Sequence, residues 1–148
     1  MPAANRRFNF FEFASLVGAT ATHQKINLNN LRDSKAMNKA LFIDRDGVIN
    51  VDKRHVYRKE DFEFTAGIFD LCRKYSDAGY KLLIITNQAG IAKGIYTEDD
   101  FNSLMEWVVE EFNRRKITID KVYYCSHHPD FTGLCRCRKP EAGMLLRV

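Results

Sequence analysis

The sequence has 148 residues, which is enough for one hydrophobic core of ordinary size and too short for two comfortable domains. Its apolar fraction of 45% and charged fraction of 28% are typical of a globular protein, and no apolar run is long enough to span a bilayer. The formal net charge of +4 lies mainly in residues 1–36, and the basic residues form no stripe of the kind that binds nucleic acid.

Residues 1–36 are expected to be an extension of unknown role before a single domain over residues 37–148. Arg6 and Arg7 precede an apolar patch, which has the outline of a signal or transit peptide, but Asn9 and Glu12 interrupt it. The extension could be an added helix, a disordered leader, or the product of a misassigned start or a fusion. Because no convincing export signal is present, we expect a cytoplasmic protein.

Strand and helix patterns alternate from residue 37 onward. Short apolar runs at 40–43, 82–85 and 122–124 predict strands that are buried on both faces. Residues 66–78 have a helical stripe that stops at Gly79, and a capping-box-like entry at 97–100 opens a second helix. The stripes consist of Ile68, Leu71, Cys72 and Tyr75, then Phe101, Leu104, Met105, Val108, Val109 and Phe112. This order predicts an α/β fold with a parallel sheet and right-handed crossovers.

Two aspartates follow the first predicted strand. Asp44 and Asp46 are two residues apart, so on an extended segment both would point to one side, with Arg45 directed away. Gly47 allows a sharp turn just beyond them. Acids at the carboxyl end of a buried strand lie where open α/β sheets bind ligands. Alternatively, they are ordinary turn and capping residues.

Thr86 and Asn87 end the second predicted strand and would stand beside the two acids. The hydroxyl, together with backbone N–H groups of the glycine-containing segment 88–94, could hold phosphoryl oxygens. The alternative is that Thr86 and Asn87 only cap a helix.

Three cysteines and a histidine gather after the third predicted strand. Cys125, His127, Cys135 and Cys137 match the four-coordinate preference of zinc, with His128 as the competing fourth ligand. A full ligand set leaves no open position, so the ion would fold the loop and take no part in catalysis. Unconnected buried cysteines are the alternative.

Lys139 follows this loop directly, and Pro140 suits the first turn of a helix. A lysine at that place can aim its ammonium group at a bound phosphate. By itself it would be read as a solvated surface lysine.

Together these motifs resemble the haloacid dehalogenase superfamily of phosphotransferases, with Asp44 and Asp46 as first motif, Thr86 as second and Lys139 as third. Within that superfamily the chain is similar, over about residues 37–146, to the heptose-1,7-bisphosphate 7-phosphatases. The segments that carry the similarity are Asp-Arg-Asp-Gly-Val-Ile-Asn (44–50), Thr-Asn-Gln-Ala-Gly-Ile-Ala-Lys-Gly (86–94), Cys-Ser-His-His-Pro (125–129) and Cys-Arg-Cys-Arg-Lys-Pro (135–140). Histidinol-phosphate phosphatases are the nearest alternative.

The resemblance implies a role for each motif. Asp44 would attack phosphorus to form an aspartyl phosphate, and Asp46 would act as general acid and then as general base. Thr86 and Lys139 would orient the phosphoryl group, and Mg²⁺ would bind the Asp44 carboxylate and the Asp46 carbonyl oxygen. The implied substrate-binding residues are Asp52, Lys53, Arg54, His55, Asn87, Gln88, Ala89 and Arg138. The implied fold is a capless Rossmann-like parallel sheet in which the zinc loop forms one wall of the cleft.

Charge favours a small sugar bisphosphate as the substrate. Lys53, Arg54, Lys93 and Arg138 would surround a second phosphate with positive charge, whereas histidinol phosphate carries an ammonium group. Together with the resemblance, this implies removal of the 7-phosphate of D-glycero-D-manno-heptose 1,7-bisphosphate. The alternative is that these cations are only solvated.

The family pattern also includes a fourth, acidic motif after a further strand, which supplies magnesium ligands. The sequence given ends before it, so we expect a C-terminally truncated domain with an incomplete magnesium site. Leu41 and Ile43 would then border an unpaired sheet edge. A zinc-stabilised but catalytically incompetent fragment is therefore a further alternative, as is a basic module that only captures phosphorylated ligands.

Overall fold

A computed structural model describes residues 39–147 of the chain. The elements in chain order are β1 (Lys39–Ile43), η2 (Lys59–Asp61), α1 (Ile68–Asp77), β2 (Tyr80–Asn87), α2 (Ala89–Ala92), α3 (Glu98–Arg114), β3 (Lys121–Cys125), α4 (Pro129–Thr132) and η3 (Ala142–Arg147). The expectations for residues 1–36 and for a domain boundary at Met37 lie outside the described residues and stay predictions. No helix in the described range is long and apolar enough to cross a membrane.

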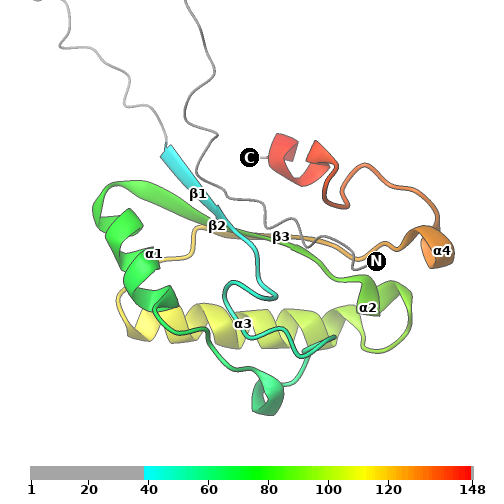
Figure 1. The fold of residues 1–148 in the computed structure, drawn as a ribbon, viewed down its shortest axis with the longest axis horizontal. Coiled ribbons are helices and arrows are strands. Elements are labelled where there is room, and N and C mark those ends of the chain that lie inside the picture. The colour runs from blue at the N-terminus through cyan, green and yellow to red at the C-terminus, as the bar shows by residue number, and fades with distance from the viewer. Residues whose placement is uncertain (1–38, 148) are drawn as a thin grey trace, which may run out of the picture. The chain divides into compact units, whose positions relative to one another are not determined.

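The three strands form a parallel sheet in the order β1-β2-β3, as the sequence predicts. Ile43 of β1 pairs with Ile84 of β2, which in turn pairs with Val122 of β3. Both crossovers step in the same direction across the sheet, so right-handed connections place α1 and α3 on the same face, as Figure 1 shows. The carboxyl ends of all three strands therefore meet at one edge of the sheet.

Only the central strand is buried on both faces. In β2 the five residues from Leu82 to Thr86 are buried, whereas most of β1 and β3 is half-buried. The expectation of full burial was therefore wrong for the two outer strands. Within the described residues, β1 pairs with β2 alone, which leaves Leu41 half-buried.

The long helix α3 follows its sequence signals. Thr97 accepts a hydrogen bond from the Asp100 N–H at 3.1 Å, and the Asp100 carboxylate accepts one from the Thr97 N–H at 2.8 Å, so the predicted capping box is present. The predicted stripe faces the core, with all of its members buried except the half-buried Val109.

Helix α1 differs from its prediction at one position. Ile68 and Cys72 are buried and Gly79 follows the helix with a φ of +80°, as expected, but Leu71 is 43% exposed. The core face is instead completed by Phe69, whose ring packs against Phe64 and Phe112. The buried face of α1 is therefore rotated from the predicted stripe toward the aromatic cluster of Phe64, Phe69 and Phe112.

Candidate phosphotransfer site and metal cluster

Asp44 is the first residue after β1, and its carboxylate lies in contact with Lys139. The Lys139 Nζ atom is 2.6 Å from Asp44 Oδ2 and also donates to the Ile85 carbonyl oxygen at 3.1 Å. Asp44 Oδ1 accepts the backbone N–H of Arg45 at 2.8 Å. The Asp44 side chain is 41% exposed, so one face of this carboxylate is open to a ligand.

Arg45 is buried, which corrects the expectation that it is directed away from the acids. Because β1 ends at Ile43, residues 45–50 form a tight turn, and the Arg45 guanidinium folds back onto Asp46. Its Nε and Nη2 atoms donate to Asp46 Oδ1 at 3.1 and 2.7 Å, and Nη2 also donates to the Val56 carbonyl oxygen at 2.8 Å. The Arg45 residue is 1% exposed.

Gln88 links Asp46 to Thr86. The Gln88 Nε2 atom donates to Asp46 Oδ2 at 3.0 Å and to Thr86 Oγ1 at 2.8 Å. Asn50 Nδ2 approaches Asp46 Oδ1 at 3.3 Å. All of these partners of the Asp46 carboxylate are hydrogen-bond donors, so both of its oxygen atoms are held in place.

A pocket of about 270 Å³ opens beside Asp46. Most of the predicted substrate-binding residues line it, and the two lining residues that no motif identified are Arg45 and Tyr96. The residues predicted to bind substrate that lie along this pocket are Asp52, Arg54, His55, Asn87, Gln88 and Ala89.

Three of the predicted cations lie elsewhere. Lys53 pairs with Glu63 at 2.9 Å on the surface, Lys93 is exposed outside the pocket lining, and Arg138 donates to the His127 carbonyl oxygen at 3.1 Å. Arg54 is therefore the member of that set that lines the pocket. The loop over 125–139 contributes no residue to the lining of this pocket, and it reaches the site through its last residue, Lys139, which contacts Asp44.

Asn87 holds the backbone of Lys139. Its Nδ2 atom donates to the Lys139 carbonyl oxygen at 3.1 Å, and its Oδ1 atom accepts the Lys139 N–H at 3.0 Å. The strand end of β2 is thus joined to the end of the loop that carries the cysteines. This two-point attachment places the Lys139 ammonium group over Asp44.

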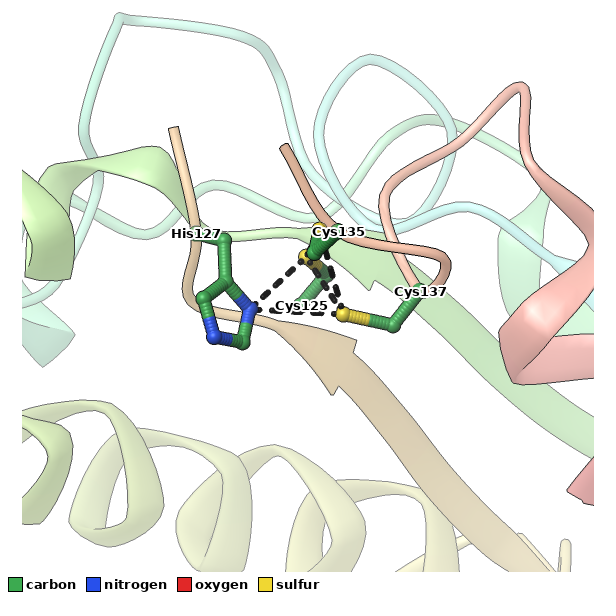
Figure 2. A group of neighbouring side chains, drawn as sticks. All are labelled: Cys125, His127, Cys135 and Cys137. Carbon is green, nitrogen blue, oxygen red and sulfur yellow. Dashed lines mark hydrogen bonds between the residues drawn. The ribbon is translucent and has the colours of Figure 1, made fainter. Parts of the chain in front are cut away.

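The predicted metal ligands come together in one cluster (Figure 2). One donor atom from each of Cys125, His127, Cys135 and Cys137 lies within 4.8 Å of the others. The sulfur atoms are 3.0 to 3.6 Å apart, and the His127 Nδ1 atom lies 3.3 Å from Cys137 Sγ. A tetrahedral ion with metal–sulfur distances of about 2.3 Å needs sulfur atoms about 3.8 Å apart, so a small expansion would admit it.

His128 lies outside this cluster and caps a helix. Its Nδ1 atom accepts the Asp130 N–H at 3.2 Å and so caps the short helix α4. His127 is therefore the histidine that joins the cysteines.

The cluster has the chemistry of a metal site. All three cysteines are free thiols, and burial raises the pKa of the Cys125 thiol to about 12, helped by its hydrogen bond with Cys137. A divalent cation would supply the positive charge that these thiolates need. The cluster can therefore hold a metal ion.

A second set of oxygen donors lies at the end of β1. Among residues 39–147, no hydrogen bond is made to the Asp46 carbonyl oxygen, and the Asp44 carboxylate is partly exposed beside it. Carboxylate and carbonyl oxygens are the ligands that Mg²⁺ takes in proteins, usually with several waters. These two groups fit part of such a site.

Two residues of the site were missed by the sequence reasoning. Strand alternation directs the Arg45 side chain away from the two acids, but β1 ends at Ile43, before Arg45. Tyr96 stands in no motif, yet its hydroxyl donates to Gln88 Oε1 at 2.6 Å. In the fold, Gly90 makes room for this ring, because a Cβ atom there would lie 2.1 Å from the Tyr96 ring.

Comparisons with known proteins agree with this geometry. The sequence model of the family described as "Polynucleotide kinase 3 phosphatase" matches residues 39–148. A Campylobacter jejuni protein named D-glycero-alpha-D-manno-heptose-1,7-bisphosphate 7-phosphatase is 56% identical over 110 residues, which cover 74% of this chain and 62% of the relative. A Yersinia pestis protein named for the beta anomer is 44% identical, with 74% and 61% covered.

A solved structure of a heptose bisphosphate phosphatase has a similar fold. The D,D-heptose 1,7-bisphosphate phosphatase from B. bronchiseptica, solved with magnesium and phosphate, matches with a TM-score of 0.66 and 27% identity over 72% of this chain and 59% of that one. The chain thus spans less than two thirds of the length of the relatives it matches. The match over residues 39–148, together with the shared fold and motifs, shows that the chain belongs to the polynucleotide kinase 3 phosphatase family of the haloacid dehalogenase superfamily.

Proposed function

We propose that this chain carries the phosphoryl-transfer centre of a magnesium-dependent phosphatase that removes the 7-phosphate of D-glycero-D-manno-heptose 1,7-bisphosphate. One observation carries the proposal: all four motif side chains take part in two adjoining contact groups at one edge of the sheet. Asp44 contacts Lys139, and Asp46 is joined to Thr86 through Gln88. These residues come from the ends of β1 and β2 and from the loop after β3.

Each of these four side chains is positioned for one part of the reaction. A carboxylate oxygen of Asp44 attacks phosphorus in line, and the bond from phosphorus to the sugar oxygen breaks. Asp46, protonated at that stage, gives its proton to the departing sugar oxygen and later takes one from the water that hydrolyses the aspartyl phosphate. Thr86 and Lys139 donate to the phosphoryl oxygens, so Lys139 exchanges its contact with Asp44 for one with phosphate.

Two metals are part of the proposal. Mg²⁺, held by the Asp44 carboxylate and the Asp46 carbonyl oxygen, would offset the negative charge of the phosphoryl group. Zn²⁺ is the ion that suits three thiolates and one imidazole, held by Cys125, His127, Cys135 and Cys137. Its ligand set is full, so its role is to hold the loop that ends at Lys139.

The pocket supports a substrate with a second anionic group. Arg54 and His55 lie along it, and the charge of Arg45 is already offset by Asp46. The proposed substrate contacts are Asp52, Arg54, His55, Asn87, Gln88 and Ala89, with Lys53 and Arg138 approaching only if their present contacts are exchanged. Relatives are named for both anomers, so the proposal covers the phosphate position and the sugar class.

The test uses the full chain with Mg²⁺ and both anomers of heptose bisphosphate, with histidinol phosphate as the competing substrate. Phosphorus NMR identifies which phosphate is released. We expect loss of the 7-phosphate from the bisphosphate at a higher kcat/KM than from histidinol phosphate, and a drop of roughly a thousandfold or more in Asp44→Asn.

The matched control is Asp77→Asn, which changes an exposed aspartate at the end of α1. It should retain the wild-type rate. Preferential turnover of histidinol phosphate, or no turnover of any of these substrates by the wild-type chain, would contradict the proposed function.

A further inference from the structure

The Asp46 carboxylate is held from two sides by buried side chains. Arg45 holds Oδ1 through two nitrogen atoms, and Gln88 holds Oδ2 through Nε2 at 3.0 Å. Arg45 and Gln88 are each 1% exposed. A carboxylate held at both oxygens cannot rotate freely, so its direction depends on what fixes these two partners.

Gln88 has one correct orientation of its amide. The NH₂ group must face Asp46 and Thr86, which leaves the carbonyl oxygen on the opposite side. That oxygen accepts the Tyr96 hydroxyl at 2.6 Å. Without the hydroxyl, the buried carbonyl oxygen would lose a partner, and a buried polar atom without a partner drives the side chain to another rotamer.

Tyr96 is itself fixed in place. Its ring lies against Gly90, where even a methyl group would meet the ring at 2.1 Å, and stacks on Tyr57 with centroids 5.1 Å apart. Tyr96 is 6% exposed. The backbone of α2 and the Tyr57 ring therefore hold the hydroxyl at the Gln88 carbonyl oxygen.

We propose that Tyr96 is a positioning residue: its hydroxyl fixes the Gln88 amide, and the amide fixes the Asp46 carboxylate for proton transfer. The role in proton transfer rests on the proposed phosphatase function. The chain of contacts from Tyr96 through Gln88 to Asp46 can be tested independently of it.

The kinetic test is a double-mutant cycle in the full chain with heptose bisphosphate and Mg²⁺. Tyr96→Phe removes only the hydroxyl and should lower kcat by about tenfold while KM changes by less than about twofold. Gln88→Met removes the amide at similar volume. If Tyr96 acts through Gln88, adding Tyr96→Phe to Gln88→Met should change kcat by less than about twofold.

Tyr57→Phe is the matched control, because within residues 39–147 the Tyr57 hydroxyl makes no side-chain hydrogen bond while its ring contacts the same stack. It should leave kcat unchanged. Multiplicative effects of Tyr96→Phe and Gln88→Met, or an unchanged kcat in Tyr96→Phe, would overturn the positioning role.

A second readout does not depend on turnover. The side-chain NH₂ signals of Gln88, assigned in ¹⁵N spectra by their loss in Gln88→Met, should shift and exchange faster with water in Tyr96→Phe, and stay in place in Tyr57→Phe. Signals that are identical in wild type and Tyr96→Phe would overturn the proposal. If the protein had no phosphatase activity, the proposed function would be refuted. The NMR measurement would still show whether the Tyr96 hydroxyl fixes the Gln88 amide.

Discussion

Arg45 is a fully buried cation in the turn after β1, and its guanidinium is the main partner of one oxygen of Asp46. It also donates to the Val56 carbonyl oxygen and lies over the Phe101 ring, 5.8 Å from its centroid. A lysine has the same charge but a single nitrogen, so it cannot replace both the Nε and the Nη2 atoms that donate to Asp46 Oδ1. Arg45 is thus required for its shape as well as its charge.

Arg45→Lys should destabilise the fold by about 1–3 kcal/mol, because Asp46 Oδ1 loses one of the two donor nitrogens of Arg45. Urea unfolding measures the change. Arg73→Lys is the control, since Arg73 is exposed and makes a single contact with the Arg115 carbonyl oxygen. If Arg45→Lys and Arg73→Lys unfold at the same urea concentration, the forked contacts of Arg45 are not needed for stability.

Cys72 gives a residue-level prediction on pH. It is fully buried in α1, and burial raises the pKa of its thiol from 9.0 to about 11. Below pH 9 the thiol is protonated in both the folded and the unfolded chain. Between pH 9 and 11 the unfolded chain releases this proton first, so the free energy of unfolding falls by about 2 kcal/mol as pH rises over this range.

Cys72→Ala removes this dependence and leaves the other titrating groups unchanged. The free energy of unfolding of wild type minus that of Cys72→Ala should therefore decrease between pH 8 and 11, measured by urea titration at each pH. A difference that stays constant over that range would contradict the assignment.

At the scale of elements, the loop between β3 and Lys139 joins the cluster of three cysteines and His127 to the proposed reaction centre. Cys137 lies two residues before Lys139, Arg138 bonds to the His127 carbonyl oxygen, and Asn87 fastens the Lys139 backbone to β2. The exposed part of the loop, with Leu134 at 93% exposure, has little core of its own. A bound ion is therefore expected to supply much of its order.

Metal analysis of protein purified without chelator should find one zinc ion per chain. Cys135→Ala should lower that content and increase protease cleavage within residues 129–136, because the loop loses a ligand. Cys72→Ala, which removes a cysteine outside the cluster, should keep the full content. Wild-type protein without zinc, or an unchanged content in Cys135→Ala, would refute the ligand set.

Sequence patterns predicted those features that depend on neighbours along the chain. The strand ends after Ile43 and around Asn87, the capping box at Thr97 and the tight Cys-x-His and Cys-x-Cys spacings are all local. The exposure of Leu71 and the inward turn of Arg45 depend on contacts that form only in the folded chain. Phe69 packs on Phe112, and Arg45 contacts Phe101 and Val56. For the same reason no motif could identify Tyr96.

For the whole molecule, the parallel sheet brings residues far apart in sequence to one edge. Asp44 follows β1, Thr86 lies near the end of β2, and Lys139 ends the loop after β3. Lys139 joins the first two strand ends, because its Nζ atom contacts Asp44 and donates to the Ile85 carbonyl oxygen. An edge built this way can support a covalent phosphoryl intermediate, with one carboxylate exposed and the other held by donors. The proposed function requires that Asp44 forms this intermediate.

The most direct test is to quench the full chain during turnover of heptose bisphosphate with Mg²⁺, trap the acyl phosphate and locate it by peptide mass spectrometry. We predict phosphate on Asp44 in the wild type and on no residue in Asp44→Asn. Phosphate release without any phosphorylated peptide, or a phosphorylated residue that persists in Asp44→Asn, would contradict it.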